Sequence, residues 1–199
     1  MIAGLLATGA FHEDGFADVC DGFGGGWTKE KIMLIMKDSR IGAFGAIGLL
    51  AILSSKFLLL RELSWLPAQS AHAGSAFFQH CYFILALFAV HSLSRLMPVL
   101  VIQWSVNVTD PDQSKSKPVT SSKLSPGGLL VPVFFALAPF ALLSWHFLLT
   151  ILPVMVICYA LNAYFKKWIG GYTGDCLGAI QQVSELVFYL GFIIIWKYT

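Results

Sequence analysis

Long apolar runs separated by short polar segments dominate this chain of 199 residues. A helix needs about 20 mostly apolar residues to cross a bilayer. Five runs of about that length predict five spanning helices, at residues 41–60, 77–104, 127–144, 146–165 and 177–196. The second run contains Pro98 and is either one kinked crossing or two shorter pieces. Neither piece alone is long enough, so we expect one crossing.

The pattern predicts an all-α, polytopic integral membrane protein with about five full transmembrane helices and a short acidic helix at the cytoplasmic face. Composition agrees, because 57% of the residues are hydrophobic and only 12% are charged, about half the charged share of a soluble domain. The net charge of +2 and the absence of any Lys/Arg run longer than two residues argue against a nucleic-acid partner.

The first ten residues are apolar but too few to span a bilayer, and they lack the features of a signal peptide. We expect them to be the end of a spanning helix whose beginning is not in this chain. The four cysteines show no metal-binding spacing and are expected to be reduced, apolar fillers.

The predicted crossings place residues 12–40, 105–126 and 166–175 on one side of the membrane. Nine of the thirteen Lys and Arg residues lie in these segments, so the positive-inside rule makes this side cytoplasmic. Lys56 falls near the far end of the first span, which leaves Arg95 as the lone cation expected inside the bilayer. The segment 105–126, rich in Asp, Ser, Lys and Pro, is predicted to be a disordered connector.

The first polar constellation is acidic. Asp14, Asp18 and Asp21 are spaced i, i+4, i+7, so in a helix they lie within roughly 60° of one another on one face. Carboxylate oxygens suit Mg²⁺, which is usually held by one or two carboxylates plus substrate phosphates. Gly15 and Gly22 leave room for a ligand or a neighbouring helix. The alternative is a solvated acidic surface, but the interleaved apolar residues indicate packing on the other side.

The second constellation is Lys37-Asp38-Ser39-Arg40, just before the first full span. Arg, Lys and Ser side chains can bind phosphate oxygens. A juxtamembrane basic anchor would explain Lys37 and Arg40 equally well, although it would not explain Asp38.

The third constellation, GGYTGDCLG at 170–178, opens the last span. Thr173 and Asp175 are suited to helix capping and to the helix dipole. Asp175, Gln182 and Glu185 nevertheless form a polar stripe with Gly178 along an apolar helix, and ionisable groups at membrane depth are usually functional.

Arg95, one helical turn after His91, either balances Glu185 structurally or reaches a substrate phosphate or carbonyl; the sequence leaves both open. Acidic metal ligands and phosphate-binding cations, with no candidate nucleophile, favour metal-assisted phosphoryl transfer.

Three motifs in order, HEDGFADVCDG followed by GGG, IMKDSRIGAFG and GGYTGDCLGA, closely resemble the cobalamin-5′-phosphate synthase (adenosylcobinamide-GDP ribazoletransferase) family. Ser94-Arg95 and residues 116–118 also fit its intermediate segments. The resemblance covers essentially the whole chain and implies one membrane-embedded ribazoletransferase domain over 1–199, lacking the family's N-terminal segment.

The resemblance implies a multi-pass enzyme of the cell (inner) membrane, with its active site facing the cytoplasm. Such an enzyme joins α-ribazole, or its 5′-phosphate, to adenosylcobinamide-GDP and releases GMP, with Mg²⁺ required. Its partners are these two substrates and the lipid bilayer; a homo-oligomer or other cobalamin-pathway enzymes are further partners that it allows.

The matched motifs and the polar residues above give the predicted site. Its residues are Asp14, Asp18 and Asp21 as metal ligands; Asp175, Asp38 and Arg40 as catalytic residues; and Lys37, Ser39, Arg95, Thr173 and Glu185 as substrate-binding residues.

Two rivals remain at this point. A CDP-alcohol phosphotransferase also binds Mg²⁺ through aspartates on membrane helices, but its longer acidic spacing is not met after Asp21. A transporter would use His91, Arg95 and Glu185 as a path, but it predicts inverted repeats that the sequence does not show.

Overall fold

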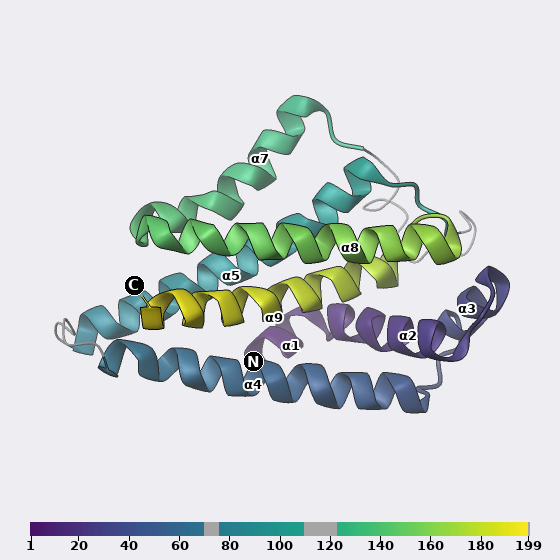
Figure 1. Ribbon diagram of the computed structural model, residues 1–199, viewed down its shortest axis with the longest axis horizontal. Helices are drawn as coiled ribbons and strands as arrows, with labels where there is room; N and C mark the ends of the chain where they lie inside the picture. Colours follow the sequence, from purple (N-terminus) through teal and green to yellow (C-terminus); the bar gives the residue numbers. More distant parts are fainter. Residues whose placement is uncertain (70–75, 110–122, 199) are drawn as a thin grey trace.

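The computed structural model describes residues 1–69, 76–109 and 123–198, and it is built from helices (Figure 1). The elements are α1 (Ile2–Thr8), α2 (Phe11–Gly25), α3 (Lys29–Met36), α4 (Ala43–Gln69), α5 (Ala76–Trp104), α7 (Pro126–Leu137), the 3₁₀ turns η1 (Ala138–Leu142) and η2 (Trp145–Thr150), α8 (Ile151–Ile169) and α9 (Gly174–Tyr198). The described β-structure is one isolated bridge, between Asn107 and Tyr172. The all-α prediction is therefore confirmed.

Within the described residues, four helical stretches are long and apolar enough to cross a membrane: Ala43–Trp65, Cys81–Trp104, Trp145–Ile169 and Gly174–Tyr198. They correspond to four of the five predicted spans. The segment 77–104 belongs to one continuous helix with Pro98 inside it, as expected. The expected connector falls largely on residues 110–122, which lie outside the described residues.

The predicted span 127–144 is not among these long helices. Its apolar helix runs only over Pro126–Leu142 and changes from α to 3₁₀ geometry after Leu137. Pro139 lies in this transition, where it has no N–H to donate and its ring clashes with the preceding turn of an α-helix. This segment is therefore shorter than the full span that its apolar composition predicted.

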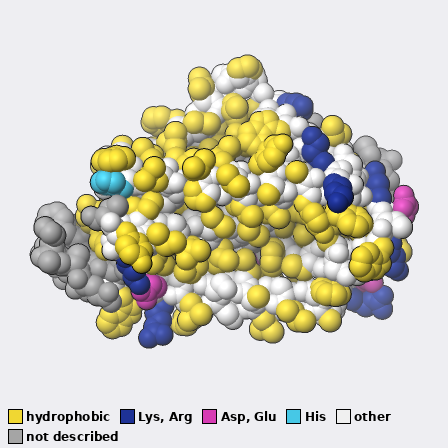
Figure 2. All heavy atoms as spheres, in the orientation of Figure 1, with side chains coloured by type: hydrophobic (Ala, Val, Ile, Leu, Met, Phe, Trp, Pro, Cys, Tyr) yellow, Lys and Arg dark blue, Asp and Glu magenta, His cyan; other side chains and the backbone are white. Residues whose placement is uncertain are grey.

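The surface matches a membrane environment. Large apolar side chains such as Leu50, Phe134 and Leu152 are exposed on α4, α7 and α8. In Figure 2, hydrophobic side chains cover most of the visible face, and charged side chains gather toward its two ends. A polytopic membrane protein is the class that this surface defines.

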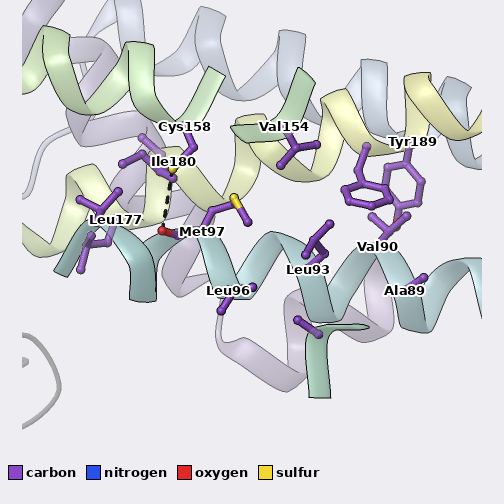
Figure 3. Close-up of a cluster of buried hydrophobic side chains, with 14 of the residues drawn as sticks. Ala89, Val90, Leu93, Leu96, Met97, Val154, Cys158, Leu177, Ile180 and Tyr189 are labelled. Carbon is purple, nitrogen blue, oxygen red and sulfur yellow. Dashed lines mark hydrogen bonds between the residues drawn. The ribbon is translucent and has the colours of Figure 1, made fainter. Parts of the chain in front are cut away.

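Helix α9 is the central helix, packed against α2, α4, α5 and α8 (Figure 1). On one side, Tyr189 and Ile180 join Met97 and Cys158 in the buried apolar cluster of Figure 3. There the Cys158 thiol donates to the Met97 carbonyl over 3.8 Å. All four cysteines are free, as expected.

Glycines bring α2 unusually close to α9. A Cβ added at Gly15 would lie 2.9 Å from the Asp175 Cα, and one at Gly178 would lie 3.0 Å from the His12 carbonyl oxygen. Small residues allow such close backbone packing between membrane helices. Of the two uses expected for the space at Gly15, a ligand or a helix, the structure shows a helix. This contact places the acidic helix beside the start of α9.

Candidate active site

The three polar motifs meet at one end of the helix bundle, the right-hand end in Figure 1. Helix α2 contacts the start of α9 through Gly15 and Asp175, and Asp21 on α2 is hydrogen-bonded to the start of α4. The turn after α8 is fixed to the segment after α5, because the Val108 N–H donates to the Tyr172 carbonyl over 2.9 Å and the Tyr172 N–H donates to the Val106 carbonyl over 3.0 Å. Motifs more than 150 residues apart in sequence are thus neighbours.

The acidic motif is helical, as predicted, and its three aspartates lie in different surroundings. Asp14 is exposed, whereas Asp18 and Asp21 are half-buried. Among the described residues, no group of three or more His, Cys, Asp or Glu side chains is close enough to hold a metal ion. Oxygen donors of this kind still fit Mg²⁺, since that ion commonly takes only one or two carboxylates and completes its shell with phosphates and water.

Asp21 also has a structural role. Its carboxylate accepts hydrogen bonds from the backbone N–H groups of Gly42 (2.7 Å) and Gly45 (2.8 Å) at the start of α4. A negative charge there stabilises the positive end of the helix dipole. A Cβ on either glycine would collide with the carboxylate, so both positions require glycine for this approach. Each oxygen retains a lone pair, and Asp21 stays a predicted ligand.

The segment 37–40 forms a local ion pair. Arg40 Nη2 lies 2.7 Å from Asp38 Oδ2, and Arg40 Nε donates to Asp38 Oδ1 over 3.0 Å. These hydrogen bonds from Arg40 lower the pKa of Asp38 from its ordinary value to about 2. The Arg40 side chain is 86% exposed, and exposed ion pairs are weak. A phosphate can therefore compete with Asp38 for Arg40, and Ser39 is exposed beside them.

The turn 170–173 leads into α9 by the capping expected from its sequence. Thr173 is buried, and its hydroxyl accepts from the Cys176 N–H over 3.3 Å. Asp175 is half-buried in the first turn of α9. The structure therefore supports capping for Thr173, and it places Asp175 beside α2 at the end where the motifs meet.

The polar stripe of α9 leads into a buried ionic cluster that sequence analysis only partly found. Lys56 Nζ lies 3.2 Å from Glu185 Oε2 and 3.6 Å from Glu13 Oε1, and it donates to Gln182 Oε1 over 2.9 Å. Gln182 Nε2 donates to Glu13 Oε1 over 2.9 Å, and Gln181 Nε2 donates to Glu185 Oε2 over 2.8 Å. We call these five residues the buried ionic cluster. Each of the five forms an ion pair or a hydrogen bond with another member, and buried charges require such partners.

Three members of the cluster were missed: Lys56, Glu13 and Gln181. The expectation that Arg95 is the lone cation inside the bilayer is wrong, because α4 continues to Gln69 and Lys56 is buried in its middle. Lys56 interrupts an otherwise apolar run, which is a signal for function, but its assumed position near a helix end hid that signal. Glu13 was read only as part of the acidic motif, although it is buried where Asp14 is exposed.

Arg95 has local partners. Its Nη1 donates to the His91 carbonyl over 3.1 Å and lies 3.2 Å from His91 Nδ1, which is itself 3.6 Å from Glu185 Oε1. The cation nearest Glu185 is Lys56. Two roles were left open for Arg95. Lys56 fills the first, which is to balance the charge of Glu185. The second, contact with a substrate, stays a prediction.

The bundle and the motifs at its end define a membrane-embedded enzyme class, and comparison with known proteins identifies the family. The family model described as Cobalamin-5-phosphate synthase matches residues 1–193. The chain belongs to this family, and it is therefore an enzyme, a transferase of cobalamin biosynthesis. This assignment sets aside both rival classes considered above.

Curated relatives carry the name adenosylcobinamide-GDP ribazoletransferase. The one from Leptospira interrogans is 42% identical over 208 residues, which cover 99% of this chain and 72% of the relative. The one from Shewanella frigidimarina is 42% identical over 198 residues, covering 96% of this chain and 68% of the relative. One from Vibrio cholerae is 39% identical over 194 residues, covering 96% and 67%. No solved structure matches this chain.

Proposed function

We propose that this protein joins α-ribazole, or its 5′-phosphate, to adenosylcobinamide-GDP and releases GMP in a Mg²⁺-dependent reaction. The name shared by the relatives supports the donor and the type of transfer. The observation that carries the proposal is the meeting of the three motifs at one end of the bundle. Carboxylates, phosphate-suited cations and a further aspartate together match the needs of phosphoryl transfer.

Asp14 and Asp18 are the residues that would hold Mg²⁺ against the diphosphate of the donor. When bound, the ion would neutralise charge on the phosphate oxygens. Asp21 serves first to fix α2 to the start of α4, which sets the position of the other two aspartates, and it can add an oxygen ligand. Lys37, Ser39 and Arg40 would bind the phosphates from the next segment, with Asp38 orienting the Arg40 guanidinium.

In the transfer, a ribose hydroxyl oxygen attacks the phosphorus nearer the corrinoid. The new O–P bond forms as the bond from that phosphorus to the bridging oxygen breaks, and GMP leaves with the bridging oxygen. Asp175 would accept the hydroxyl proton or complete the metal shell. Glu185 and Arg95, with Thr173 at the start of α9, are the remaining candidates for substrate contacts.

The enzyme is proposed to lie in the cell (inner) membrane with this end of the bundle in the cytoplasm. The excess of Lys and Arg in the segments at this end supports that orientation. A cytoplasmic site would also have direct access to Mg²⁺ and to a nucleotide-activated donor.

The test is GMP release by the full chain purified in detergent, with adenosylcobinamide-GDP and α-ribazole or its 5′-phosphate, with and without Mg²⁺. We expect metal-dependent release that falls at least about 10²-fold in Asp18→Asn, with Glu30→Gln as the control because Glu30 is an exposed acidic residue on α3. Unchanged turnover in Asp18→Asn, or release without any divalent ion, would contradict the proposal.

A further inference from the structure

A half-open cavity of about 800 Å³ is bordered by α1, the start of α2, α4, α5 and α9. Binding sites for small molecules typically have about 300–1,000 Å³. Much of its wall is apolar and includes Leu5, Phe57, Leu60, Phe83 and Leu87. The buried ionic cluster and His12 form one polar part of the wall. The cavity therefore suits a ligand with an apolar body and a polar end.

Two polar atoms at this end have no hydrogen-bond partner among the described residues: Glu13 Oε2 and His12 Nδ1. The Glu13 side chain is only 9% exposed, and its other oxygen accepts from Gln182. A buried carboxylate oxygen without a donor is unfavourable. Glu13 thus needs a donor such as a hydroxyl group.

The one cation of the cluster, Lys56, is already paired. Lys56 contacts Glu185 and Glu13 and donates to Gln182, so this part of the cavity offers no uncompensated cation to a diphosphate. A sugar hydroxyl fits it better than a diphosphate does. Arg61 and Arg95 also border the cavity, where they would meet a 5′-phosphate on a nucleoside that carries one.

We infer that this cavity binds the acceptor nucleoside, with its planar, apolar base against Leu60, Phe83 and Leu87 and a ribose hydroxyl donating to the Glu13 carboxylate. The inference rests on the proposed function and deepens it. Glu13 directly precedes Asp14, and consecutive helix residues are about 1.5 Å apart along the axis and about 100° apart around it. The acceptor would reach α2 from this cavity, whereas the diphosphate would reach it from the end of the bundle where the three motifs meet.

The experiment measures binding of α-ribazole and of its 5′-phosphate, separately, to the full chain in detergent by isothermal titration calorimetry, without Mg²⁺ or donor. Leu60→Trp fills the cavity and is expected to weaken binding by about tenfold or more. Leu58→Trp is the matched control, because Leu58 is on the same helix, does not border the cavity and is 57% exposed.

Glu13→Gln provides a second variant that keeps the side-chain volume and removes the charged acceptor. It is also expected to weaken binding by about tenfold, with a melting temperature measured alongside to show that the protein is folded. GMP release by the wild-type protein is measured in the same preparation.

The outcomes separate the inference from the proposed function. If wild-type protein releases GMP but neither acceptor form binds, or Leu60→Trp binds as tightly as Leu58→Trp, the inference is overturned and the proposed function stands. If neither GMP release nor acceptor binding is found, the proposed function fails and the inference fails with it. Selective loss of acceptor binding in Leu60→Trp and Glu13→Gln supports the inference.

Discussion

Adjacent residues of α2 face two contrasting environments. Asp14 is exposed, whereas Glu13 is buried against Lys56 and Gln182. An exposed carboxylate keeps its water and can exchange it for a metal ion, while a buried one must be neutralised by fixed protein partners. In the proposed site the exposed Asp14 would hold the metal ion, whereas Glu13 is fixed in the buried ionic cluster.

The largest effect on stability is expected from removing the cation of the buried ionic cluster. Lys56→Met leaves Glu13 and Glu185 without their shared cation, which should lower the free energy of unfolding by about 3–5 kcal/mol. Thermal unfolding in detergent measures this loss, with Lys166→Met at the exposed end of α8 as the control. Adding Glu185→Gln to Lys56→Met should recover part of the stability; no recovery would mean that charge pairing is not what Lys56 supplies.

A smaller effect is expected where α2 contacts α9. Gly15→Ala places a methyl group 2.9 Å from the Asp175 Cα, a backbone atom, so the helices must separate at a cost of about 1–3 kcal/mol. We expect lower thermal stability and a marked drop in GMP release. Gly127→Ala is the control, because nothing lies within 4 Å of its added Cβ. Equal behaviour of the two variants would refute the close packing of α2 on α9.

Substitution of Asp21 is expected to lower the stability of the protein more than substitution of Asp14, two helical turns earlier on α2. Asp21→Ala removes the acceptor of the Gly42 and Gly45 N–H groups and should lower the free energy of unfolding by about 1 kcal/mol. Asp14→Ala, at an exposed position, should leave the unfolding midpoint unchanged while reducing Mg²⁺-dependent activity. Denaturant titration monitored by circular dichroism distinguishes the two, and equal destabilisation would remove the special role of Asp21.

The smallest effect concerns pH and the exposed ion pair. Because Arg40 lowers the pKa of Asp38 to about 2, whatever stability this pair adds is present above the carboxyl's ordinary pKa. It is lost only as the pH falls through the lowered value. Asp38→Asn should therefore shift the melting temperature little and equally across about pH 5 to pH 8. A difference that grew toward pH 5 would show that the pair titrates there.

Apolar run length predicted the four long helices and the single crossing at 77–104, because a bilayer demands about 20 apolar residues whatever their order. It overestimated 127–144, where Pro139 alters the local backbone. The helical spacing of the aspartates was enough to predict the acidic helix. The partner of Asp21 could not be predicted, because the contact depends on how α2 packs against the start of α4. The pairing of Glu13 with Lys56 was missed for the same reason.

The central claim is that a divalent ion binds where the three motifs meet. Replacing Mg²⁺ by Fe²⁺ and adding ascorbate and peroxide cuts a backbone close to the bound ion, and the fragments can be mapped by mass spectrometry. We expect cuts near Asp14 and Asp18, in 37–40 and near Asp175, all lost when Asp14 and Asp18 are both changed to Asn. Cuts confined to other segments, or cuts that persist in that double variant, would contradict it.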